Sequence, residues 1–293
     1  NGPFSQKIVQ GEFAVSVEML PSRGTAPRTL QAKIDFVREL ATSGLADALD
    51  LTDGSRGIPL MPPGDFIAVL RQGLGWTLET GDALELIPHF TTRDLNVMGL
   101  QSRLIGYWAQ RIHNVLIITG DPPKVGDYPH ATAVFDLDSV GMLRMIEHFN
   151  RGTDPAGKDV GQVTSFYCAC GAEPAALDYE RELRRLEEKK AAGASMIMTQ
   201  PVYDPDVLDR FLRDTEHLEM PVLVGLLPLA SWRNAEFLHN EVPGMAVPED
   251  MAWRLEAGSD LLLKLHLLPS GKPEVVRCAV GFLTWSCRPS RSA

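Results

Sequence analysis

Polar side chains recur at the ends of apolar runs along this chain, and residues placed in this way could support chemistry. The run Val115 to Ile118 breaks into Thr119, Gly120 and Asp121, followed by two prolines. Proline cannot donate to a strand ladder, so the strand must stop there, and glycine lets a backbone approach a ligand closely. Asp121 is therefore predicted to follow the carboxyl end of a strand, where α/β barrels keep their active sites.

The same arrangement recurs at four other predicted strands. Their carboxyl ends carry Glu18, Thr52 with Asp53, His89 with Thr91, and Gln200 with Tyr203. Any one of these could be an ordinary strand-end turn. Because packing alone does not readily produce a polar residue at the same place on strand after strand, the set favours one shared ligand site.

Glu18 and Asp121 are the candidate catalytic residues. Glu18 lies between the apolar residues Val17 and Met19, which predicts a partly desolvated carboxyl that holds a proton and acts as a general acid. A solvated glutamate at a barrel rim is the alternative. The Asp121 carboxylate could accept hydrogen bonds from a ligand or tune a cofactor electrostatically.

Three further residues are candidates for binding. The Gln200 amide both donates and accepts, which suits the edge of a pterin-like or flavin-like ring. His89 could bond a phosphate or a ribityl chain, with a structural histidine as the alternative. Lys189 lies on a charged predicted helix over 178–192, where most basic side chains should pair with glutamates and one could reach a cofactor phosphate.

Composition narrows the class of protein. The 293 residues carry a net charge of −10, which argues against nucleic acid as a partner because phosphate binding needs clustered lysine and arginine. No apolar run approaches the roughly 20 residues of a membrane-spanning helix, and the first residues lack the apolar segment of a signal peptide. Cys168 and Cys170 are expected to be buried thiols rather than metal ligands. We therefore expect a cytoplasmic protein without a metal.

Strands and helices alternate, which predicts a parallel sheet with right-handed crossovers. Strands are predicted over 13–19, 46–51, 84–89, 115–118, 163–170, 196–199 and 222–227. Helices are predicted over 29–42, 65–72, 95–111, 136–150, 178–192 and 206–215, and a seventh begins at Trp232 after a Ser231 cap. Seven strand–helix pairs favour a (β/α)₈ TIM barrel over an open sheet, because such barrels need about 250 residues.

The chain is expected to form a single barrel domain over 1–293, with a divergent segment over 258–293. A closing strand is expected within 261–267 or within 275–283, after a helix over 248–257. Neither a GxGxxG fingerprint nor a P-loop occurs, so nothing indicates a Rossmann site.

Five motifs resemble a known family. VSVEMLP, DLTDG, HFTTRD, TGDPPK and MTQPVYD, in this order and spacing, resemble the methylenetetrahydrofolate reductases over roughly residues 5 to 257. The closest likeness is to the bacterial branch fused to a homocysteine S-methyltransferase domain. The resemblance implies a flavin-binding (β/α)₈ barrel in which FAD takes a hydride from NAD(P)H and passes it to 5,10-methylenetetrahydrofolate, giving 5-methyltetrahydrofolate.

The resemblance also implies roles for individual residues. By position, Glu18 matches the general acid that protonates the folate nitrogen as the five-membered ring opens, and Asp121 matches a carboxylate near the flavin and pterin. Gln200 matches a folate-ring contact, and Tyr203 follows in the same substrate-binding motif. The implied cofactor-binding positions are Thr52, His89, Thr119, Gly120, Asp121, Glu182 and Lys189. Thr119 stands where the family commonly has arginine.

Two alternatives stay open. The chain could be a catalytically silent folate-binding barrel domain of a larger protein, or a flavoenzyme reduced by an electron-transfer partner. Methylenetetrahydrofolate is the implied ligand, and a fused or associated homocysteine methyltransferase domain or an oligomer is compatible with the sequence. Neither nucleic acid nor a membrane is expected as a partner.

Overall fold

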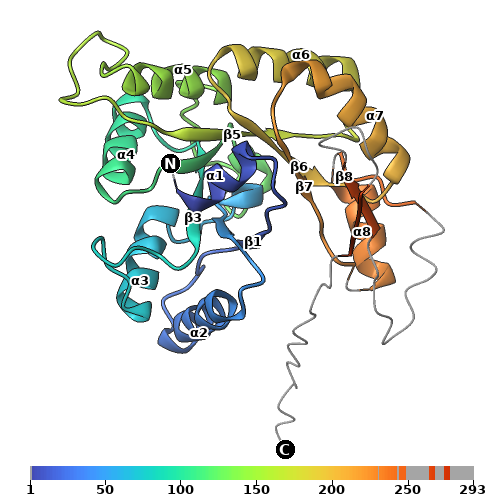
Figure 1. Cartoon of the computed structure of the whole chain (residues 1–293), viewed down its shortest axis with the longest axis horizontal. Helices are drawn as coiled ribbons and strands as arrows, with labels where there is room; N and C mark the ends of the chain where they lie inside the picture. The colour runs from blue at the N-terminus through green and yellow to red at the C-terminus, as the bar shows by residue number, and fades with distance from the viewer. Residues whose placement is uncertain (1, 230, 243, 249–263, 268–273, 278–293) are drawn as a thin grey trace, which may run out of the picture.

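A parallel sheet of seven strands dominates the computed structural model, which describes residues 2–229, 231–242, 244–248, 264–267 and 274–277. The strands are β1 (Ser16–Met19), β2 (Ala48–Leu51), β3 (Glu85–Thr91), β4 (Asn114–Ile118), β5 (Tyr167–Ala172), β6 (Met196–Pro201) and β7 (Val222–Gly225). They lie in sequence order and every neighbouring pair is parallel. The sheet curls as a barrel wall does, so the predicted parallel α/β architecture is confirmed (Figure 1).

A helix follows each strand. These helices are α2 (Pro27–Ser43), α3 (Pro63–Leu74), α4 (Val97–Ala109), α5 (Ser139–Asn150), α6 (Tyr179–Ala191), α7 (Pro205–Thr215) and α8 (Trp232–Glu241). In Figure 1, α2 to α7 lie around the outside of the curled sheet. Asp138 caps α5 by accepting from the Gly141 N–H at 2.8 Å, and Ser231 caps α8. The seven predicted strand–helix pairs are therefore present.

One further helix, α1 (Pro3–Val9), was not predicted. Its Phe4 is 1% exposed and packs with Ala48, Ile87 and Leu116, which line the inner face of the sheet. Lys7 forms a 2.9 Å ion pair with Asp47, just before β2 begins. The helix therefore covers the amino-terminal edge of the sheet, and the strand ends that carry the polar residues lie at the opposite edge.

Alternation along β2 shows how the two faces of the sheet differ. Leu49 and Leu51 belong to the core between the sheet and the outer helices, whereas Ala48 belongs to the inner cluster. Since side chains alternate across a strand, Asp50 and Ala48 share the inner face. Cys168 and Cys170 are buried in the outer core at 2% and 0% exposure, as predicted.

The C-terminal part differs from the expected closing unit. Two short strands, β8 (Lys264–Leu267) and β9 (Glu274–Arg277), pair antiparallel with each other in a separate sheet. They overlap the two segments in which a closing strand was expected. The helix expected over 248–257 falls almost entirely outside the described residues. Throughout the described part of the chain, each helix is too short or too polar to span a bilayer.

Candidate active site

The carboxyl ends of the first three strands are linked by side-chain hydrogen bonds. The Thr52 hydroxyl donates to Glu18 Oε1 at 2.9 Å, which joins β1 to β2. The next link joins β2 to β3, because Asp53 Oδ2 accepts from the Thr91 N–H at 3.0 Å and from the Thr91 hydroxyl at 2.9 Å. The predicted site residues of these strands therefore lie in one continuous polar edge.

Glu18 is an exposed side chain, so its expected desolvation is wrong. Val17 and Met19 flank it in sequence, but neighbours on a strand point to the opposite face and do not cover it. Glu18 pairs in register with Asp50 of β2. Its carboxylate is thus open to a ligand on one side and held by Thr52 on the other.

His89 lies at the same edge, on β3, and is 7% exposed. Burial lowers the pKa of its imidazole, while the charges of Glu18 and Asp53 act in the opposite direction. Among the described residues, His89 has no hydrogen-bond partner. A neutral imidazole offers one donor and one acceptor, so His89 can bind an uncharged polar group of a ligand.

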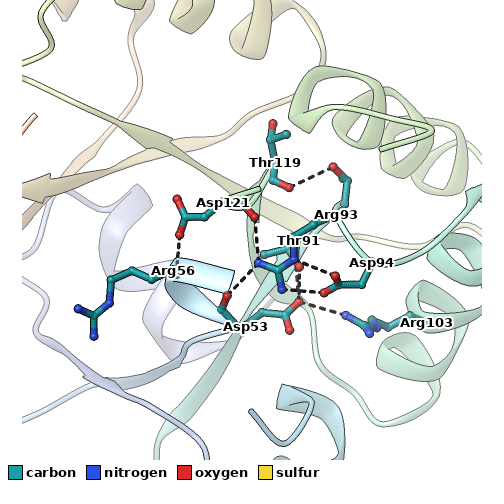
Figure 2. A network of polar contacts seen from close by, with 10 residues as sticks. Asp53, Arg56, Thr91, Arg93, Asp94, Arg103, Thr119 and Asp121 are labelled. Atoms are coloured by element: carbon teal, nitrogen blue, oxygen red, sulfur yellow. Dashed lines mark hydrogen bonds and ion pairs between the residues drawn. The ribbon is translucent and has the colours of Figure 1, made fainter. Parts of the chain in front are cut away.

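Arg93 forms hydrogen bonds that connect the loops after β2, β3 and β4 (Figure 2). Its side chain is 7% exposed, and its guanidinium donates to the Gly54 carbonyl at 2.9 Å and the Asp121 carbonyl at 3.2 Å. A bidentate contact to Asp94, at 2.8 and 2.7 Å, balances its charge. The loops after β2, β3 and β4 are therefore fixed relative to one another.

Asp121 directs its side chain toward the loop after β2. Its Oδ2 accepts from the backbone N–H of Arg56 at 2.6 Å, and Arg56 has a left-handed backbone with φ 54° (Figure 2). The Asp121 side chain is exposed, so a ligand can also reach it. The carboxylate thus stabilises a strained turn and adds negative charge to the open edge.

The two residues before Asp121 have different roles. Gly120 has φ 89°, and a Cβ there would lie 3.0 Å from the Cβ of Thr91, so the position excludes other side chains. The Thr119 hydroxyl accepts from the Ser139 N–H at 3.1 Å, at the start of α5. Thr119 therefore positions α5 in addition to any contact with a ligand.

Glu182 and Lys189 lie together at the end of β5. Lys189 Nζ donates to the Gly171 carbonyl at 2.7 Å, and Glu182 Oε1 accepts from the Glu173 N–H at 3.1 Å. Both side chains come from α6; Lys189 holds the end of β5 and Glu182 holds the first residue after it. In this arrangement the Lys189 ammonium already has one backbone partner.

Gln200 lies near the end of β6 and Tyr203 follows this strand, and the two differ in exposure. The Gln200 side chain is exposed, which leaves its amide accessible. Tyr203 is 9% exposed and donates to the Leu227 carbonyl at 3.0 Å, and burial raises the pKa of its phenol to about 12. Tyr203 therefore links the loop after β6 to the loop after β7.

Two important residues were missed in the sequence. Asp50 is a buried carboxyl on the inner face of β2, and Arg93 organises the loops. The motif ALDL contained a signal for Asp50, since an acidic residue two positions before Thr52 must share its face of the strand. Nothing in HFTTRD distinguished Arg93 from a surface arginine.

The open edge suits a flavin. A flavin ring presents carbonyl and N–H groups, which pair with neutral donors and acceptors such as the His89 imidazole and the Gln200 amide. Gly120 presents bare backbone next to Thr91, where a side chain could not be accommodated. The donor set therefore fits this cofactor.

The fold and site define a class, namely parallel α/β proteins with titratable and amide side chains collected at the carboxyl edge of the sheet. The sequence profile of the methylenetetrahydrofolate reductase family matches residues 3–261. The chain therefore belongs to the methylenetetrahydrofolate reductase family.

Individual relatives are distant. The 5,10-methylenetetrahydrofolate reductase of Salmonella typhimurium is 25% identical over 78% of this chain and 69% of its own length. The probable methylenetetrahydrofolate reductase (NADH) of Oryza sativa subsp. japonica is 28% identical over 51% of this chain, and the match spans only 26% of the rice protein. A solved structure of oxaloacetate acetylhydrolase overlaps with a TM-score of 0.49 and 10% identity, over 85% of this chain and 89% of that chain.

Proposed function

We propose that this chain is a flavin-dependent reductase that converts 5,10-methylenetetrahydrofolate to 5-methyltetrahydrofolate, with NAD(P)H as the hydride donor. The observation that carries the proposal is the family match over residues 3–261, combined with the accessible Glu18 carboxylate at the open edge. A bound FAD would supply the hydride carrier between the nicotinamide and the folate.

In this proposal Glu18 and Asp121 are the catalytic residues. Glu18 gives a proton to the folate nitrogen that leaves as the five-membered ring opens, and Thr52 aims its carboxyl by a 2.9 Å hydrogen bond. The negative charge of Asp121 disfavours additional negative charge on a flavin bound nearby. It would therefore favour loss of a hydride from the reduced flavin. Arg93 fixes the Asp121 loop against the loop after β2, and Thr52 holds Glu18 at the same edge.

The binding roles follow from the family resemblance and, for Gln200, also from its exposed side chain. Gln200 recognises the folate ring through its amide, with Tyr203 supporting the loop beneath it. Thr52, His89, Thr119, Gly120, Glu182 and Lys189 are the proposed flavin-contact positions, together with Asp121. Within the described residues the His89 imidazole has no hydrogen-bond partner, and Gly120 has no side chain to cover its backbone, so both can bond to a ring. Lys189 already donates to the Gly171 carbonyl, so it can bind a phosphate only while it keeps or shares that hydrogen bond.

The surrounding context is also proposed. We infer that an eighth strand completes a (β/α)₈ barrel, and that residues 1–293 act as a single flavin-binding domain with a divergent segment over 258–293. The protein is proposed to work in the cytoplasm, with a fused or associated homocysteine methyltransferase domain that consumes its product. Size-exclusion chromatography with and without such a domain would test this partner and the oligomeric state.

Flavin binding separates this function from the silent-domain alternative. Purified protein should be yellow, or become yellow on reconstitution with FAD. A colourless protein that FAD cannot reconstitute would favour a silent folate-binding domain. Anaerobic bleaching by NADH or NADPH is expected for the proposed reductase, and its failure with both would favour an electron-transfer partner as the reductant.

A further inference from the structure

Asp50 is a buried carboxyl beside the proposed general acid. It lies on the inner face of β2, is 5% exposed and pairs in register with Glu18 of β1. Neighbouring strands lie about 4.8 Å apart, so carboxyls at paired positions can reach each other directly or through one water molecule. The two acids therefore form a pair, one exposed to a ligand and one enclosed.

Each of the two carboxyls accepts a hydrogen bond from a hydroxyl on the other strand. Ser16 of β1 donates to Asp50 Oδ2, and Thr52 of β2 donates to Glu18 Oε1 at 2.9 Å. Asp50 Oδ1 is buried and has no hydrogen-bond partner among the described residues. A buried oxygen without a donor is costly for a carboxylate, and far less so for a carboxylic acid.

The surroundings of Asp50 favour its protonated form. The pKa of its carboxyl is raised to about 7: burial is the main cause, the Ser16 hydrogen bond opposes it, and the charge of Glu18 adds to the rise. Burial lowers the pKa of His89 on β3, although the charges of Glu18 and Asp53 favour its protonated form. No described cation bonds to Asp50, so no ion pair holds it ionised.

We propose that Asp50 stores the proton that Glu18 delivers to the folate, so that the two carboxyls share one proton at neutral pH. This inference rests on the proposed function. An exposed glutamate is normally ionised at neutral pH, so a general acid in this position needs a proton source. Asp50 is an enclosed carboxyl in register with Glu18, and it can provide one.

The proton moves in two steps, first from Asp50 to Glu18 and then from Glu18 to the folate. The O–H bond of Asp50 breaks and the proton moves to the Glu18 carboxylate, which leaves Asp50 ionised. Glu18 then protonates the folate nitrogen as the carbon–nitrogen bond breaks and the nitrogen keeps its electron pair. The carbon receives the hydride that the reduced cofactor supplies, and Asp50 regains a proton from solvent through Glu18.

The kinetic test compares Asp50→Asn with wild type under anaerobic conditions. The rate at which methylenetetrahydrofolate oxidises the reduced flavin should fall in wild type as pH rises through about 7. In Asp50→Asn this fall should occur at lower pH, with a loss of at least about tenfold near pH 7.5 and recovery near pH 5. Flavin reduction by NAD(P)H should not change. The matched control is Asp47→Asn, a carboxyl at the other end of β2, which should keep the wild-type pH profile.

A second readout needs neither flavin nor folate. The infrared C=O stretch of a protonated carboxyl should titrate near pH 7 in wild type, be absent in Asp50→Asn and persist in Asp47→Asn. Ser16→Ala removes the bond that favours ionised Asp50, so the band should then titrate at higher pH. This variant keeps the test available if Asp50→Asn does not fold.

The two proposals fail in different ways. If folate does not oxidise the reduced flavin of the wild type, the proposed function is wrong, although the infrared band still reports on proton storage. If wild type turns over folate but Asp50→Asn keeps both its pH profile and the carboxyl band, Asp50 does not store the proton. A band in Ser16→Ala that titrates as in wild type would also contradict the assignment.

Discussion

The hydroxyl of Thr52 donates a 2.9 Å hydrogen bond to the carboxyl of Glu18, from the end of β2 to the end of β1. Thr52 is 4% exposed, whereas Glu18 is open to solvent. A buried and therefore well-ordered donor thus orients an accessible acid. This relationship explains how an exposed glutamate can have a defined direction at a reaction site.

Thr52→Val removes that donor and keeps the shape of the side chain. A hydrogen bond of this kind contributes about 0.5–1.5 kcal/mol, so folate reduction should slow by up to about tenfold. The measurement is single-turnover oxidation of the reduced flavin by methylenetetrahydrofolate. Thr52→Ser keeps the hydroxyl and should restore most of the rate. Equal rates in wild type and Thr52→Val would show that the bond does not orient Glu18 during the reaction.

Asp121→Asn separates charge from structure. An asparagine oxygen can still accept from the Arg56 N–H, so the turn after β2 should remain intact. Loss of the negative charge should raise the flavin reduction potential and weaken folate turnover. Potentiometric titration and steady-state assays measure the two effects. An unchanged potential with normal turnover would remove Asp121 from the site.

Arg93→Lys tests the link between the loops. Lysine cannot reproduce the forked contacts of the guanidinium to Asp94 and to the carbonyls of Gly54 and Asp121. The free energy of unfolding should fall by about 1–3 kcal/mol, since buried carbonyls lose their donors. Urea denaturation measures this loss. Arg213→Lys, at an exposed i,i+4 ion pair, is the control and should change stability by less than about 0.5 kcal/mol.

Asp50 should make the free energy of unfolding decrease as pH rises. The pKa of its carboxyl is raised from 3.8 to about 7 on folding, so the folded state binds the extra proton between these values. Its stabilising contribution is complete below about pH 4 and is lost as pH rises through about 7. His89, with a lowered pKa, acts in the opposite direction, so the difference between wild type and Asp50→Asn isolates the effect.

Urea denaturation at about pH 5 and about pH 8 gives that difference. Wild type should lose more stability than Asp50→Asn as pH rises between these values. A parallel loss in both proteins would mean that Asp50 has the same proton affinity in the folded and unfolded states.

The sequence was most informative about the seven strands, because each apolar run ends in a polar residue or a proline. It gave no warning of α1, whose seven residues are too few for a periodic pattern and whose Phe4 is explained only by the inner face that it covers. Partial desolvation of Glu18 was wrongly predicted and the solvated alternative holds, because its apolar neighbours point to the other side of the sheet. Lys189 shows a further limit, since sequence alone does not reveal that its ammonium binds the Gly171 carbonyl.

In the proposed reaction, this chain passes a hydride to methylenetetrahydrofolate while Glu18 supplies the proton. The most direct measurement follows both half-reactions anaerobically in wild type and in Glu18→Gln. Wild-type flavin should be reduced by NAD(P)H and reoxidised by methylenetetrahydrofolate. Glu18→Gln should keep the first rate and lose about 10²- to 10⁴-fold in the second. Wild-type reduced flavin that methylenetetrahydrofolate does not oxidise, or equal losses in both half-reactions of Glu18→Gln, would contradict this account.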